Sequence, residues 1–239
     1  MKIAIFVEGL TEDIFVTALL REYFNPGTIQ IASEKLFGKK ARRIFFKSLR
    51  DTQQCGEHSC LIVDVSNDES VLSRLKENYE GMREEGYTAF LGLRDLKSAQ
   101  YEKFGEQIIQ SARDTVDRFK VQDDVFFHFA KTETEAWFLA EPRVFERINS
   151  TLTLEAIEHE IGMNREEVDP QEEIANPATI VRRIHRLAGL RYSKKKKEVY
   201  QLVSRLDWEE LCVNTKAKSH ISFFFDFLDD LERSLTAPN

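Results

Sequence analysis

Short apolar runs alternate with helical patterns along the first 130 residues. The apolar runs are rich in β-branched and aromatic residues, as buried strands are, and span residues 3–7, 28–32, 59–65, 87–93 and 125–130. The helical patterns span residues 12–24, 71–85 and 101–119. This alternation predicts an α/β fold, a parallel sheet flanked by helices. Right-handed crossovers in such a sheet bring the carboxyl ends of the strands to one edge.

The composition changes after Glu141-Pro142. Acidic residues crowd together between residues 149 and 175, and a helix is expected to begin at Asn176-Pro177. A Phe-rich amphipathic helix is expected over residues 220–233, packed in the core or, alternatively, at a homodimer interface. We therefore expect an α/β domain over residues 1–140 and a C-terminal helical appendage over residues 141–239.

Acidic residues stand where three of the expected strands end. Glu8 follows the first strand, Asp64 lies near the end of the strand at 59–65, and Asp95 follows the strand at 87–93. After the first strand, Gly9 permits a tight turn and Thr11 is the expected N-cap of the next helix. Converging carboxylates provide the oxygen ligands that Mg²⁺ prefers. The alternative is that each acid merely caps a helix or favours the positive end of a helix dipole.

Two further acids, Glu133 and Glu135, follow the last expected strand and are predicted to lie near the same edge. The same alternative holds for both, since they stand at the start of a predicted helix. The chain contains no serine-hydrolase elbow, phosphate-binding loop, dinucleotide fingerprint or histidine pair at zinc spacing. The candidate chemistry is therefore carboxylate chemistry, or none.

Basic residues gather in two stretches of this otherwise acidic chain. The first covers residues 35–50 and the second residues 182–197, and both are interpreted as either a solvated face or a contact surface for phosphates. The candidate nucleic-acid-binding residues are Lys39, Lys40, Arg42, Arg43, Arg182, Arg183, Arg186, Lys194 and Lys195.

The bulk composition limits the class of protein. Hydrophobic residues make up 42% and charged residues 31% of the chain, which argues against an intrinsically disordered protein. The formal net charge of -7 argues against a protein that coats nucleic acids generally. Three cysteines without paired-ligand spacing favour reduced thiols. We find no long apolar span and no signal peptide, so we expect a cytoplasmic protein that does not bind membranes.

The segment Val7-Glu8-Gly9-Leu10-Thr11-Glu12 resembles the first motif of the Toprim fold, as it occurs in nucleases of the overcoming-lysogenization-defect type. Leu93-Arg94-Asp95-Leu96 falls where that fold places its Asp-x-Asp motif. Together with residues 64–68 and 133–140, these segments look like an uncharacterised family of Toprim-like proteins found among prokaryotic defence genes. The resemblance covers about the first 140 residues and implies a Toprim-like parallel sheet.

The resemblance also implies site residues and a cofactor. Glu8 and Asp95 are expected to hold Mg²⁺ (or Mn²⁺), with Glu12 and Glu133 as a further ligand or as the base that orients water. Lys97 stands where the family has its second aspartate, so either Glu133 or Glu135 is expected to supply the missing oxygen. Lys97 or Lys131 is then expected to offset charge on the scissile phosphate. The expected sets are, for catalysis, Glu8, Glu12, Asp95, Lys97 and Glu133, and, for the metal, Glu8, Asp95, Asp64 and Glu135.

By resemblance, the function implied is phosphodiester hydrolysis of DNA or RNA by an effector of a prokaryotic antiphage defence system, paired with an ATPase. One alternative is a non-catalytic adaptor whose degenerate site binds no metal and whose basic helix docks an acidic partner. Another is a phosphotransfer or nucleotide-binding domain of flavodoxin-like topology, for which the chain offers no phosphate loop.

Overall fold

The computed structural model describes residues 1–24, 29–36, 48–49, 58–66, 71–120, 125–218 and 220–236. They divide into two compact units. The sheet unit comprises Met1–Asp95, Phe104–Phe129 and Asp226–Asn239, and the helical unit comprises Leu96–Lys103 and Ala130–Phe225.

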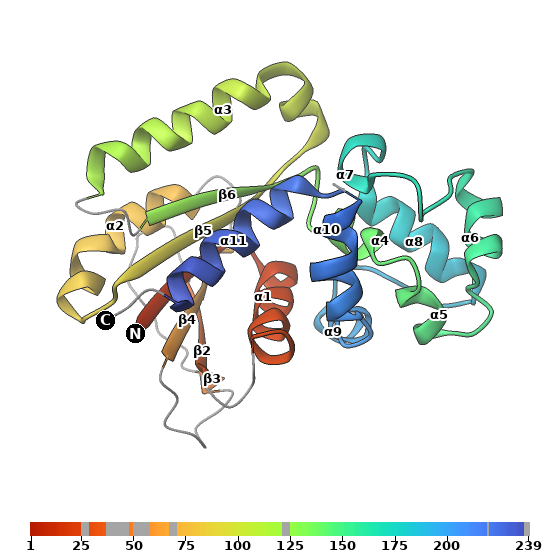
Figure 1. Ribbon diagram of the computed structural model, residues 1–239, viewed down its shortest axis with the longest axis horizontal. Helices are drawn as coiled ribbons and strands as arrows, with labels where there is room; N and C mark the ends of the chain where they lie inside the picture. Colours follow the sequence, from red (N-terminus) through yellow and green to blue (C-terminus); the bar gives the residue numbers. More distant parts are fainter. Residues whose placement is uncertain are drawn as a thin grey trace. The chain divides into compact units, whose positions relative to one another are not determined.

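The sheet has six strands, in the order β3-β2-β4-β1-β5-β6 (Figure 1). The strands are β1 (Lys2–Val7), β2 (Ile29–Lys35), β3 (Ser48–Leu49), β4 (His58–Asp64), β5 (Ala89–Leu96) and β6 (Val125–Lys131). β1 pairs in parallel with β4 and β5, and β2 pairs in parallel with β4. Only the two-residue β3, among the pairings that the structure describes, runs antiparallel to its neighbour. This is the α/β fold that the alternating pattern predicts.

Helices cover both faces of the sheet. α2 (Val71–Glu84) and α3 (Ser98–Phe119) lie on one face, where Phe6, Phe90 and Tyr79 belong to one apolar cluster (Figure 1). α1 (Leu10–Glu22) lies on the other face. There it contacts β2, since the hydroxyl of Ser33 donates to Asp13 of α1 at 2.9 Å. The apolar residues of β1 alternate between these two faces, as the period of two in a strand requires.

The helical unit contains mostly short helices. They are α4 (Glu135–Ala140), α5 (Val144–Ile148), α6 (Leu154–Ile161), α7 (Pro170–Glu173), α8 (Pro177–Leu187), α9 (Lys196–Val203), the π-helical segment η2 (Glu210–Asn214) and α10 (Thr215–Ala217). α8 begins with Pro177 at its first turn, as expected from the sequence. Asp169 caps α7 by accepting a hydrogen bond from the backbone N–H of Gln171 at 2.9 Å.

The final helix, α11 (Ser222–Thr236), passes from one unit into the other. Its second half belongs to the sheet unit, where Phe227 packs edge-on against His128 of β6 at 5.6 Å between ring centroids. Phe224 and Phe227 are both fully buried, which confirms core packing for this helix. The units therefore differ from the expected division at residue 140, because the apolar face of α11 completes the sheet unit while residues 96–103 join the helical unit.

Candidate functional site

The strand register brings three of the predicted acids onto neighbouring strands. Val7, the last residue of β1, pairs with Asp64 on β4 and with Leu93 on β5. Glu8 is one residue beyond Val7, and Asp95 is two residues beyond Leu93. The sequence pattern had placed Asp95 after the strand. β5 runs on to Leu96, however, so Asp95 lies within the strand. The carboxyl edge of the sheet thus carries Asp64, Glu8 and Asp95 on consecutive strands.

Glu8 is tied directly to the end of β5. Its Oε2 atom accepts a hydrogen bond from the backbone N–H of Asp95 at 3.0 Å. Glu8 is half-buried and Asp95 is buried. The contact fixes the Glu8 carboxylate at the backbone of the residue that carries the second carboxylate.

The turn after β1 is built around Gly9. A Cβ on Gly9 would lie 3.6 Å from Oε2 of Glu12, so the carboxylate of Glu12 reaches back over this turn. Glu12 is buried, although it stands in the first turn of α1. The helix begins at Leu10 with Gly9 as its N-cap residue, so the prediction that Thr11 caps it is wrong. Because Gly9 O already accepts from Asp13 N at 3.0 Å, Thr11 lies inside the first turn.

Asp64 has protein partners for both of its oxygens. Oδ1 accepts hydrogen bonds from the backbone N–H of Ser66 at 2.8 Å and from its hydroxyl at 3.1 Å. Oδ2 forms an ion pair with Nζ of Lys35 at 3.0 Å. These contacts satisfy a buried carboxylate that would otherwise be costly to keep ionised. Asp64 is therefore held by protein contacts on the side of the site next to β2.

Glu8 and Asp95 have the chemistry of Mg²⁺ ligands. Within the described part of the chain, no three or more His, Cys, Asp or Glu side chains are grouped so as to hold a metal ion. Mg²⁺ typically takes one or two protein carboxylates and completes its octahedral shell with water and phosphate oxygens. The pair formed by Glu8 and Asp95 on adjacent strands fits that smaller donor set.

Glu133 and Glu135 belong to the helical unit and share one cation. Lys194 Nζ lies 3.3 Å from Glu133 Oε1 and 3.0 Å from Glu135 Oε2. Glu133 also accepts from the backbone N–H of Ala178 at 2.8 Å, which caps the N-terminus of α8, and Tyr192 donates its hydroxyl to Glu135 at 2.9 Å. Burial raises the pKa of the fully buried Glu135, while Lys194 opposes that rise. We refer to Glu133, Glu135, Tyr192 and Lys194 as the acid–lysine cluster.

The two lysines expected to act on phosphate have different surroundings. Lys131 is buried, forms an ion pair with Glu172, and lies 4.1 Å from the centroid of the Tyr101 ring. Lys97 is exposed.

Between β6 and Glu133, Thr132 adopts a φ of 70°, an uncommon conformation for a β-branched residue, and its N–H donates to the carbonyl of Leu96 at 2.9 Å.

The predicted nucleic-acid-binding residues also separate into groups. Lys39, Lys40, Arg42 and Arg43 lie outside the described residues. Arg183 is paired with Glu160 at 3.1 Å, and Lys194 belongs to the acid–lysine cluster. Arg182, Arg186 and Lys195 are exposed, with Arg182 and Arg186 one turn apart on α8. Of the predicted basic residues that the structure describes, these three are the exposed ones.

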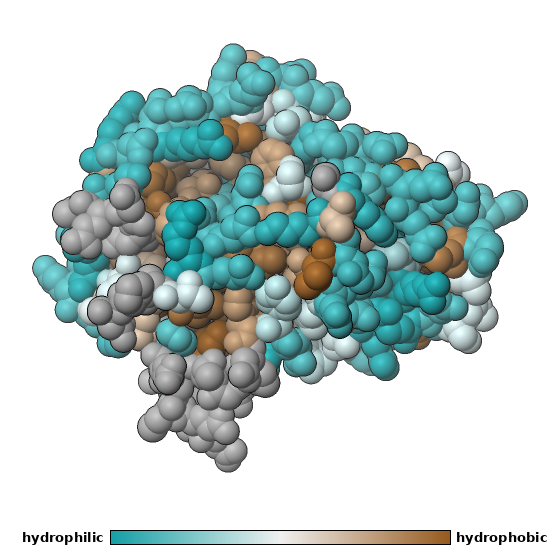
Figure 2. Space-filling model, viewed as in Figure 1, coloured by the Kyte–Doolittle hydropathy of each residue, from teal (hydrophilic) through white to brown (hydrophobic). Residues whose placement is uncertain are grey.

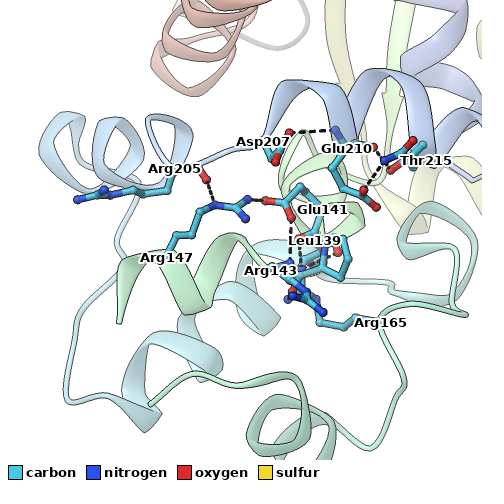
Figure 3. Close-up of polar contacts among 11 residues, drawn as sticks. Leu139, Glu141, Arg143, Arg147, Arg165, Arg205, Asp207, Glu210 and Thr215 are labelled. Carbon is cyan, nitrogen blue, oxygen red and sulfur yellow. Dashed lines mark hydrogen bonds and ion pairs between the residues drawn. The ribbon is translucent and has the colours of Figure 1, made fainter. Parts of the chain in front are cut away.

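Sequence reasoning missed a second polar centre in the helical unit, formed by Arg165, Glu141 and Arg147 (Figure 3). The guanidinium of the buried Arg165 donates to the carbonyls of Leu139, Glu141 and Pro142, each at 2.7 Å. Burial lowers the pKa of Arg165 to about 9, which still leaves it protonated at neutral pH. The buried carboxylate of Glu141 is paired with Arg147. The one available signal was Glu141-Pro142, which marks the end of α4.

The fold and its edge define the class of protein: an α/β protein whose central strands end in carboxylates. The chain belongs to the family described as a domain of unknown function (DUF4276), whose model matches residues 7–214. No curated protein and no solved structure matches the chain. None of the helices over the described residues is both long enough and apolar enough to span a membrane.

Proposed function

We propose that this protein hydrolyses phosphodiester bonds in nucleic acid with the help of Mg²⁺. The observation that carries the proposal is the contact between Glu8 and Asp95. The Glu8 carboxylate accepts a hydrogen bond from the backbone N–H of Asp95, so two acidic residues lie side by side at the carboxyl edge of adjacent parallel strands, where α/β proteins bind their ligands. The resemblance of residues 7–12 and 93–96 to Toprim nucleases supports the same reaction.

Within this proposal the acidic residues at the edge of the sheet have separate roles. Glu8 and Asp95 hold the cation, which when bound stabilises negative charge on the phosphoryl group. Glu12, buried beside the Gly9 turn, orients the attacking water and accepts its proton on a carboxylate oxygen. The ion pair between Asp64 and Lys35 fixes the neighbouring strand end, so Asp64 is a positioning residue and not a ligand.

Exposed cations supply the affinity for the polyanion. Arg182, Arg186 and Lys195 of the helical unit contact phosphates, so binding weakens as the salt concentration rises. The resemblance extends the proposal to a role as an effector in antiphage defence, together with an ATPase partner.

Cleavage assays with matched carboxylate variants test the proposal. Single- and double-stranded DNA and RNA are incubated with wild type, Glu8→Gln, Asp95→Asn and the surface control Glu77→Gln, in Mg²⁺, in Mn²⁺ and in EDTA. We expect cleavage with either metal, none in EDTA, wild-type rates for Glu77→Gln, and a loss of at least about 100-fold for the two site variants. Circular dichroism establishes that each variant is folded. Unchanged cleavage by folded Glu8→Gln would contradict the proposal.

A second candidate is a non-catalytic adaptor, which is favoured by a specific observation. Three of the expected site acids, Asp64, Glu133 and Glu135, are each paired with a lysine. An adaptor needs no metal at the sheet edge. Titration of Mg²⁺ and Mn²⁺ followed by calorimetry distinguishes the two functions: heat that disappears in the Glu8→Ala, Asp95→Ala double variant favours the nuclease. Absence of heat, together with absence of cleavage of every substrate, favours the adaptor.

A further inference from the structure

A pocket of about 320 Å³ opens in the sheet unit between α3, β5 and β6, on the face opposite α1. α3 contributes Phe104, Ile108 and Ala112, and β6 contributes Phe127 and Phe129. Figure 2 shows hydrophobic side chains in the region between α3 and β6. The volume is at the lower end of the range for small-molecule sites, about 300–1,000 Å³.

The packing of α3 explains why the pocket is there. Towards its C-terminal end, Val116 and Phe119 join the apolar cluster of the sheet. Phe104, near its other end, is 55% exposed, so it stands at the rim of the pocket. The floor is fixed, because the ring of Phe127 fills the space where a side chain on Gly92 would lie.

Arg94 brings a cation into this lining, which also contains the polar side chains of Gln107 and Ser111. It follows Leu93 on β5 and lines the pocket, whereas the neighbouring Asp95 alternates to the opposite face. The Nε atom of Arg94 is buried and has no hydrogen-bond partner among the residues that the structure describes. A buried polar group without a partner costs free energy, and a guanidinium matches carboxylate and phosphate in a planar, two-bond geometry.

We propose that this pocket binds a small aromatic anion, of one or two rings, whose anionic group pairs with Arg94. The rings of Phe104, Phe127 and Phe129 provide edges and faces for an aromatic body. The pocket has room for such a molecule but not for a dinucleotide. The site is independent of the proposed hydrolysis, because none of its lining residues is a carboxylate.

The test uses the full chain and two fluorescent probes that differ in charge. The probes are 1-anilinonaphthalene-8-sulfonate, an anion, and N-phenyl-1-naphthylamine, its neutral counterpart. We expect saturable binding of the anion at least about 10-fold tighter than that of the neutral probe, a difference of about 1.4 kcal/mol. Displacement by 1-naphthoate or by 1-naphthyl phosphate then distinguishes a carboxylate ligand from a phosphate ligand.

Variants assign the binding to this pocket. Arg94→Met is expected to weaken the anion about 10-fold and leave the neutral probe unchanged, while Arg94→Lys keeps most of the affinity. Ala112→Phe fills the pocket and is expected to abolish binding of both probes, with Ile108→Trp as a second filling variant if the first does not fold. Arg113→Met, an exposed arginine on the same helix, serves as the control. Wild-type affinity in folded Arg94→Met, or undiminished binding in a folded filled variant, would overturn the proposal.

Discussion

Lys194 places its ammonium 3.0 Å from the carboxylate of Glu135, a side chain with no solvent exposure. The two residues are 59 positions apart in the sequence, and their pairing connects the start of α4 with the segment before α9. A buried carboxylate with one cationic partner depends strongly on that partner.

Replacing Lys194 with Met is therefore expected to destabilise the protein by about 3 kcal/mol at neutral pH. Urea unfolding measures the change, and Lys195→Met, an exposed neighbour, is expected to change stability by less than about 0.5 kcal/mol. Adding Glu135→Gln to Lys194→Met should recover much of the loss, because the uncompensated charge is then gone. Equal stabilities for Lys194→Met and Lys195→Met would contradict this account.

The same pair predicts a pH dependence. Burial raises the pKa of Glu135 in the folded state, so the folded protein binds this proton more tightly than the unfolded chain does. Its contribution to stability is then fully present below the ordinary glutamate pKa of about 4.3 and is lost as the pH rises through the folded pKa. Without Lys194 the pKa rises further. The stability deficit of Lys194→Met is therefore expected to be larger at pH 8 than at pH 5, as denaturant titrations at the two pH values would show.

Replacing Arg165 is expected to destabilise the protein more than replacing any exposed arginine of the helical unit. Arg165→Met removes the donors of three carbonyl groups, and we expect a loss of about 3–5 kcal/mol. Arg165→Lys should recover only part of it, since one ammonium cannot reproduce the planar guanidinium. Thermal unfolding measures the effect, with the exposed Arg143→Met as control. A melting temperature for Arg165→Met equal to that of the control would refute it.

Two glycines should respond in opposite directions to alanine. A Cβ at Gly92 would lie 2.4 Å from a ring carbon of Phe127, so Gly92→Ala is expected to cost about 1–3 kcal/mol. Gly81 lies within α2 and a Cβ there meets no heavy atom within 4 Å, so Gly81→Ala should stabilise the protein by about 0.5–1 kcal/mol. Chemical denaturation of both variants provides the comparison. Adding Phe127→Ala should relieve part of the Gly92→Ala penalty.

Charge reversal on α8 tests the basic surface. The Arg182→Glu, Arg186→Glu double variant is expected to weaken nucleic-acid binding and to lower the slope of log affinity against log salt by about 2. Fluorescence anisotropy at several salt concentrations gives that slope. Arg113→Glu, Arg118→Glu on α3 makes the same change in net charge and should leave the slope near the wild-type value. If both double variants lower it equally, only the overall charge matters.

Local patterns predicted most of the elements of the sheet unit. The apolar runs at 3–7 and 125–130 became β1 and β6 within a residue at either end, since burial of a strand depends on side chains adjacent in the sequence. The placement of Glu8 and Asp95 at strand ends followed from the runs at 3–7 and 87–93. The extension of β5 through Leu96 was missed, because Arg94 and Asp95 interrupt the apolar pattern although the strand continues through them.

By itself, the sequence of this protein determined its α/β class, most of the helices and strands of the sheet unit, and the acids at the ends of β1, β4 and β5, because periodicity and strand ends are local properties of the chain. Only the tertiary structure decided the strand order, the pairing of Glu133 and Glu135 with Lys194, the burial of Arg165 and the division of α11 between two units. These features join residues far apart in the sequence, and which of them meet depends on the packing of whole elements, which spacing along the chain does not encode.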